Sequence, residues 1–182
     1  MFLRPAKPDD AAGISAVHAR AWNETYRGMM PDAFLDAFVN EPRVDAWRAR
    51  LMQPAARTAT WVAVNADDTV LGFATSGPAR EVALTTDGEI YAINLVMKAT
   101  RHGLGTRLMQ AMADMLIENA FDSAGLWVLE RNVGARWFYE RLGGTIAARQ
   151  ERDFGGTTLV ELGYVWRDIG ALKRAAAQVL AS

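Results

Sequence analysis

The stretch from Glu89 to Ala120 constrains the fold more than any other part of this 182-residue chain. An apolar run, Ile90 to Met97, is typical of a buried strand, and a short polar turn from Lys98 to His102 follows it. The apolar residues beyond the turn recur at helical spacing and share one face: Leu104, Leu108, Met112, Met115 and Leu116. The sequence therefore predicts a strand, a turn and a helix in direct succession.

The turn into this helix contains two glycines, Gly103 and Gly105, and is flanked by Arg101 and Arg107. The first N–H groups of a helix have no partner within the helix, and the helix dipole favours negative charge beside them. Glycine also lets a ligand approach the backbone closely. We therefore expect a phosphate-binding cradle here. The alternative is that the glycines only let the helix pack closely against its strand.

Two common nucleotide motifs do not match this turn. The dinucleotide fingerprint G-x-G-x-x-G would require a third glycine where Leu108 stands. A P-loop requires Gly-Lys-Ser/Thr, whereas this chain has Gly105-Thr106-Arg107. The sequence disfavours both.

Composition narrows the classes of function. The formal net charge of −1 argues against broad nucleic-acid or anionic-membrane binding, and no apolar run approaches the roughly 18 residues of a membrane span. There are no cysteines, so disulfides, thiolate metal sites and a cysteine nucleophile are excluded. With only His18 and His102, we expect no histidine metal cluster. We expect a cytoplasmic protein with no metal, nucleic-acid or membrane partner.

The remaining elements predict one α+β domain. Expected strands are 2–4, 60–64, 70–75, 125–130, 145–149 and 159–166, and expected helices are 11–26, 32–38, 43–52, 133–142 and one within 168–182. Asn132 is expected to cap the helix that Gly143 ends. No linker divides the chain.

A second stretch, Leu129 to Gly143, carries an Asn at the helix start and a Phe-Tyr pair before Leu-Gly. Together with the residues RHGLG at 101–105 and the order of elements, it resembles the GNAT superfamily of acyl-CoA-dependent N-acetyltransferases. The stretch His18 to Leu35 is similar to one common bacterial branch of that superfamily. The resemblance implies a GNAT-like domain over 1–167, with 168–182 as a helical extension of it. It also implies a mixed, mostly antiparallel sheet of six to seven strands flanked by helices.

The resemblance also implies a site for acetyl-CoA. Backbone N–H groups from Arg101 to Thr106 would hold its pyrophosphate, and the strand edge at Leu95, Val96 and Met97 would pair with its pantetheine arm. The implied contacts are Leu95, Val96, Met97, Arg101, His102, Gly103, Leu104, Gly105, Thr106, Asn132, Ala135 and Tyr139. The chain departs from the family at Thr100, where Gln or Arg is usual.

Tyr139 is the expected general acid. Acetyl transfer to an amine expels the CoA thiolate, and a nearby O–H can protonate that sulfur. Tyr139 follows Asn132 by seven residues and Ala135 by four, so the three lie along one helical stripe, which by resemblance faces the thioester. The alternative is a core tyrosine whose hydroxyl reaches one partner.

An amine is protonated near neutral pH, so the reaction also needs a base. Glu89, at the start of the central strand, is the expected base, since many family members place a carboxylate there. The alternative is a solvated charge at the strand end. Glu130 and Asn94 are lesser candidates for the base or a water-orienting group.

By analogy with the family, Trp22, Tyr26 and Met29 line the acceptor side, although aromatic residues at helical spacing are usually core. We expect acetyl transfer from acetyl-CoA to a primary amine of a small molecule or peptide, by direct attack. The alternative is a non-catalytic module that binds or senses acyl-CoA. The sequence leaves the acceptor's identity open, together with homodimer formation through an end strand or the last helix.

Overall fold

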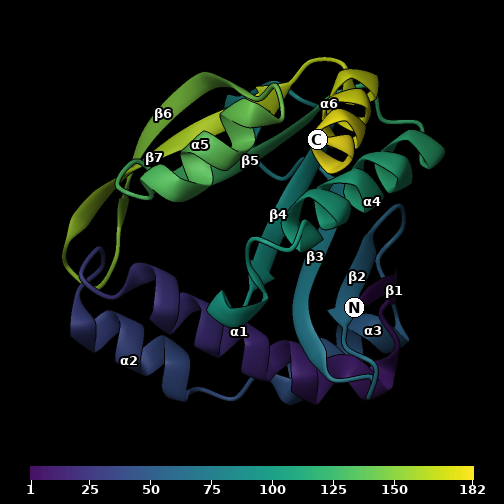
Figure 1. The fold of residues 1–182 in the computed structure, drawn as a ribbon. Coiled ribbons are helices and arrows are strands. Elements are labelled where there is room, and N and C mark those ends of the chain that lie inside the picture. The colour runs from purple at the N-terminus through teal and green to yellow at the C-terminus, as the bar shows by residue number, and fades with distance from the viewer.

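The computed structural model describes residues 1–182 as one sheet flanked by helices (Figure 1). The strands are β1 (Phe2–Pro5), β2 (Ala59–Val64), β3 (Val70–Pro78), β4 (Gly88–Leu95), β5 (Ala124–Leu129), β6 (Thr145–Asp153) and β7 (Thr158–Trp166). The α-helices are α1 (Ala11–Tyr26), α2 (Asp32–Asn40), α3 (Val44–Met52), α4 (Leu104–Glu118), α5 (Val133–Arg141) and α6 (Ile169–Ala181). Short 3₁₀ turns occupy Pro8–Asp10, Val82–Leu84 and Met97–Ala99.

The sheet has seven strands in the order β1-β2-β3-β4-β5-β7-β6. All neighbours are antiparallel except β4 and β5, which run parallel. That parallel pair is joined only at Gly88 and Glu89, beside Ala124 and Gly125. Beyond these residues the two strands separate, so the sheet opens into two halves and leaves the rest of β4 with a free edge (Figure 1).

The core occupies both faces of the β1–β4 half. Phe73 of β3 meets His18 of α1 and Trp47 of α3 in edge-to-face contacts. The preceding residue, Gly72, faces the opposite side of the sheet, where a Cβ would meet the Leu95 side chain. Helix α6 lies alongside α4 and contributes Ile169, Leu172 and Ala176 to the same hydrophobic cluster (Figure 1).

The predicted fold class and the order of elements are confirmed. The expected α1 has the observed ends, and the other elements differ by a few residues at their termini. The largest differences are at β6, which continues four residues beyond Arg149, and at β3, which continues three residues beyond Thr75. Strand β4 ends at Leu95 rather than Met97 because Met97 begins a 3₁₀ turn. None of the helices combines the length and the apolar character needed to cross a bilayer.

Candidate active site

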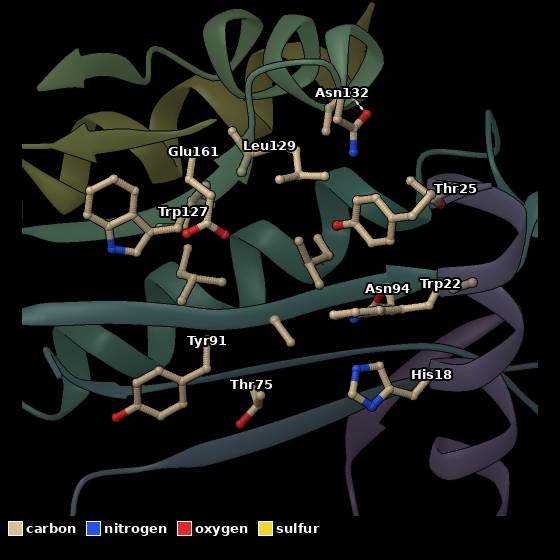
Figure 2. A pocket seen from close by; sticks show the side chains of 18 of the residues that line it. His18, Trp22, Thr25, Thr75, Tyr91, Asn94, Trp127, Leu129, Asn132 and Glu161 are labelled. Carbon is tan, nitrogen blue, oxygen red and sulfur yellow. Dashed lines mark hydrogen bonds between the residues drawn. The ribbon is translucent and has the colours of Figure 1, made fainter. Parts of the chain in front are cut away.

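The separation of β4 from β5 opens a cavity of about 560 Å³ (Figure 2). Its walls come from α1, the free part of β4, β5, the start of α5, and β7. Side chains from segments far apart in the sequence therefore meet in one space, as Trp22, Asn94, Asn132 and Glu161 do in Figure 2. The ends of β4 and β5 lead from this space to the start of α4 and α5.

The free edge of β4 offers backbone groups to a ligand at Leu95. Val96 donates its N–H to the Leu71 carbonyl of β3 at 3.0 Å. Because neighbouring residues of a strand direct their N–H groups to opposite edges, those of Leu95 and Met97 face away from β3. The Met97 N–H is bound by the Glu24 carboxylate at 2.6 Å. Of the three residues predicted to pair with pantetheine, Leu95 thus has its peptide on an edge that no strand covers.

The turn before α4 forms a row of free backbone donors. No N–H group from Arg101 to Thr106 donates to an acceptor in the protein, and the first helical bond is the one from Arg107 to the Gly103 carbonyl at 2.9 Å. Arg101 and Gly103 both have left-handed backbone angles, with φ of 63° and 72°. Consecutive N–H groups in such a turn converge on an anion. This row therefore fits a pyrophosphate.

Close packing does not account for Gly105. A Cβ at this position would lie 3.4 Å from the Phe138 ring, an ordinary van der Waals contact.

The Thr100 side chain, which stands where the family has Gln or Arg, donates to the Met97 carbonyl at 2.7 Å. It is therefore bound within the turn, and the backbone supplies the anion-binding groups.

Helix α5 presents the predicted stripe to the cavity. Asn132 caps the helix, since its Oδ1 accepts the Ala135 N–H at 3.2 Å. This bond leaves the Asn132 amide nitrogen on the cavity side in Figure 2. Asn132, Ala135 and Tyr139 all line the cavity, so the structure brings the three residues together as expected.

The Tyr139 hydroxyl has no hydrogen-bond partner in the protein, although the side chain is only 7% exposed. Tyr164, which packs beside it at 5.8 Å between ring centroids, instead donates its hydroxyl to the Glu140 carboxylate. Tyr164 is thus the satisfied core tyrosine of this pair, and Tyr139 keeps its O–H available to a ligand. Burial raises the pKa of Tyr139, with a smaller contribution from Tyr26, so the phenol stays protonated at neutral pH.

Glu89 is not a solvated strand-end charge, because it is only 2% exposed. Arg80 donates three hydrogen bonds to it: its backbone N–H to Oε2 at 2.8 Å, and its Nε (3.2 Å) and a terminal guanidinium nitrogen to Oε1. The Arg80 guanidinium also lies 4.1 Å from the centre of the Tyr91 ring. Glu89 lines the cavity, but both of its carboxylate oxygens are occupied.

The lesser candidates lie apart from one another. Asn94 lines the cavity without a side-chain hydrogen bond in the protein. Glu130 lies outside the cavity lining, 3.7 Å from Arg149 and 45% exposed. Only Asn94 therefore has a place from which to contact a bound acceptor.

The acceptor side is aromatic. Trp22 and Tyr26 line the cavity, and Trp22 also stacks on Phe38 with 3.7 Å between ring centroids. Met29 does not line it and packs instead against a small cluster that includes Met30, which does. Of the three predicted acceptor residues, the structure thus places two at the cavity.

His18 also faces the cavity, below β4 in Figure 2. Its ring meets Trp22, Phe38, Trp47 and Phe73 edge-on, and its Nδ1 has no partner. Burial, followed by the charges of nearby arginines, lowers its pKa to about 4. The imidazole is therefore neutral at pH 7.

The sequence reasoning did not single out Glu161 or Trp127. Glu161 is 8% exposed on β7, and Trp127 of β5 lines the cavity with an Nε1–H that has no acceptor. A charged residue inside the apolar run LVELGYVW was a signal for the first of these, because an ionised side chain is rarely buried in a strand without a role. No group of three or more His, Asp or Glu side chains has metal-binding geometry.

Comparison with known families gives one consistent result. The sequence profile described as the Acetyltransferase (GNAT) family matches residues 19–144. The uncharacterized N-acetyltransferase YuaI of Bacillus subtilis is 32% identical over 171 residues, covering 94% of this chain and 95% of that protein. The matched residues include β4, the turn before α4, and α5.

Solved structures show the same fold. The PaiA N-acetyltransferase of Thermoplasma acidophilum in complex with coenzyme A superposes with a TM-score of 0.69 at 18% identity, covering 88% of this chain and 96% of that one. YncA of Salmonella typhimurium, described as an acetyltransferase with its cofactor acetyl-CoA, gives 0.65 at 17% identity, covering 91% and 92%. At these identities the likeness concerns the fold.

Proposed function

The chain belongs to the GNAT family of acetyltransferases, which use acetyl-CoA as the acetyl donor, and we propose that it acetylates a primary amine of a small molecule or peptide. The observation that carries this proposal is the cavity between the separated strands. Leu95 on the open edge of β4 and Tyr139, whose hydroxyl is free, both line this cavity, and the free donors of 101–106 follow the end of β4 along the chain. Acetyl-CoA bound by these donors and by Leu95 would present its thioester to Tyr139.

The binding residues follow from their free backbone groups. The N–H groups from Arg101 to Thr106 would hold the pyrophosphate of acetyl-CoA, which supplies the activated acetyl thioester. The Leu95 peptide would pair with the amide-rich pantetheine as an added strand does. Asn132, with its oxygen occupied by the helix cap, would donate its amide N–H groups to the same arm or its sulfur.

Tyr139 would act as the general acid. The amine attacks the acetyl carbonyl directly, the C–S bond breaks, and the departing sulfur takes a proton from the Tyr139 hydroxyl. The position of Tyr139 on the cavity, with a hydroxyl that no protein group binds, supports this assignment, because its proton is free to pass to the thiolate. Glu89 as the base stays a prediction, and its three bonds from Arg80 favour a structural role for it.

Release of free thiol from acetyl-CoA, measured over a panel of polyamines, amino acids, aminoglycosides and peptide N-termini, tests the proposal. We expect amine-dependent thiol release with at least one class. Binding of CoA in a calorimeter without turnover on any amine would favour the non-catalytic acyl-CoA module instead. Folded protein that binds no CoA would overturn both functions.

A further inference from the structure

We infer that Glu161, in the middle of β7, binds the ammonium group of the acceptor and takes its proton. This inference rests on the acetyl transfer proposed above. Glu161 is paired with Leu129 of β5 across the two strands and is 8% exposed. Figure 2 shows its carboxylate turned into the cavity, between Trp127 and the Asn132 end.

One oxygen of this carboxylate is held and the other is free. Oε2 accepts a hydrogen bond from Gln150 Nε2 at 2.9 Å and lies 3.5 Å from Arg152 Nε. Oε1 has no hydrogen-bond partner in the protein. The first contacts orient the group, and the second oxygen is left for a cationic donor. An ammonium supplies such a donor and would form a charge-assisted hydrogen bond with it.

Glu161 also lies near the expected reaction centre. Its partner Leu129 accepts the Asn132 N–H at 2.9 Å, so the strand position opposite Glu161 lies three positions before the cap of α5. Tyr26, Tyr139 and Glu161 all line the same cavity, so the carboxylate shares this space with the proposed acid.

The other two carboxylates that line the cavity are less suited to bind an ammonium group. Both oxygens of Glu89 are occupied by Arg80. Glu81 lies at the outer end, 34% exposed and bound to Arg152 at 2.7 Å. Glu161 alone among the three combines burial with an unpartnered oxygen.

The proton balance of the reaction is complete with this assignment. The ammonium gives one proton to Glu161, and the neutral amine attacks the acetyl carbonyl. The C–N bond forms, the C–S bond breaks with its electron pair on sulfur, and Tyr139 protonates that sulfur. The remaining excess proton on nitrogen restores Tyr139 through solvent, and Glu161 releases its proton to solvent. The products are the amide, the CoA thiol and one proton.

The Glu161→Gln variant tests the inference, because glutamine keeps the shape and the Gln150 and Arg152 side of the site but cannot accept the proton. We expect kcat/KM for the amine to fall by about 100-fold at pH 7, the scale of general-base catalysis. We also expect the loss to shrink by about tenfold from pH 7 to pH 9, as unprotonated amine becomes available. A purely structural defect would give a loss that does not depend on pH in this way.

Three controls keep the outcome interpretable. Acetyl-CoA affinity by calorimetry should match the wild type, which shows that the variant is folded. Glu81→Gln, a change of the same type in the same cavity, should stay within about threefold of the wild type, and Glu161→Asp should recover part of the activity. Should Glu161→Gln turn over like the wild type at pH 7, the inference is wrong, whatever the activity of Glu89→Gln. Absence of amine-dependent turnover in the wild type overturns the proposed function itself, and the inference with it.

Discussion

Arg80 binds Glu89 through its backbone N–H and its guanidinium, so one residue occupies both oxygens of a carboxylate that is only 2% exposed. The pair joins the end of β3 to the start of β4, where the sheet begins to open. Its position suggests that it stabilises the floor of the cavity rather than acting on a substrate.

Replacing Arg80 by alanine should therefore destabilise the fold. The buried Glu89 would keep only the backbone donor, and a charged group left short of partners costs about 1–3 kcal/mol. Urea unfolding at pH 7 measures this loss. Arg50→Ala is the matched control, since Arg50 lines the same cavity without a carboxylate partner and stacks on Trp47. Equal stability of the two variants would contradict a structural role for the Arg80–Glu89 pair.

The Tyr139→Phe variant should lower kcat by about 100-fold and leave acetyl-CoA affinity within about twofold of the wild type. Phenylalanine keeps the ring packing against Tyr164 and Trp166 but removes the proton donor. Steady-state kinetics and calorimetry give the two values. Tyr164→Phe removes a hydroxyl that is bound to Glu140 outside the cavity lining and should leave kcat near the wild-type value. Unchanged turnover in Tyr139→Phe would remove this residue as the acid.

His18 should make the stability of the protein depend on pH. Its pKa is about 4 in the folded protein and 6.5 as a free side chain, so the unfolded chain binds the proton more readily. The neutral His18 contributes fully to the free energy of unfolding above pH 6.5. This contribution is lost as the pH falls from 6.5 towards 4, and the loss amounts to at most about 3 kcal/mol. His18→Phe keeps an aromatic ring among its neighbours and removes the titration.

The free energy of unfolding, measured for both proteins between pH 7.5 and pH 4.5 in roughly half-unit steps, isolates this effect. Protonation of buried carboxylates also destabilises the fold in acid, but it does so equally in both proteins. The free energy of unfolding of the wild type should therefore fall relative to that of His18→Phe as the pH falls below about 6.5. A difference that stays constant across the range would contradict a buried neutral His18.

Glu24 should compete with the coenzyme for the end of β4. Its carboxylate holds the Met97 N–H at 2.6 Å and places a negative charge beside the turn that is proposed to bind pyrophosphate. Glu24→Ala frees this N–H and should tighten CoA binding about fivefold, the equivalent of one hydrogen bond. Calorimetric titration with CoA measures the change, and Glu118→Ala at the far end of α4 is the control. Weaker binding would show instead that Glu24 orders the turn for the ligand.

The parts of the site that the sequence predicted are those carried by one local segment. The apolar strand, the turn with Gly103 and the helix face lie within about thirty consecutive residues, and helical spacing alone aligns Asn132, Ala135 and Tyr139. Backbone conformation follows closely from such short-range patterns. The turn with unpaired backbone donors and the helical stripe could therefore be located before any tertiary contact was known.

The parts that it did not predict depend on how distant strands pair. Glu161 faces Leu129 only because β7 inserts between β5 and β6, a sheet order that the sequence alone does not specify. Arg80 reaches Glu89 because the connection between β3 and β4 folds back through a 3₁₀ turn. In both cases the charged residues are visible in the sequence, but whether they are buried or hydrogen-bonded depends on how the strands pair.

Backbone amide chemical shifts, recorded with and without CoA, test the proposed coenzyme site most directly. We expect the largest changes at Leu95, at residues 101–106 and at the start of α5, because these groups would contact the ligand. Residues at the opposite end of α4, such as Glu118, should change little. Shifts that spare 101–106 and gather between α4 and α6 would contradict a coenzyme site at the opening of the sheet.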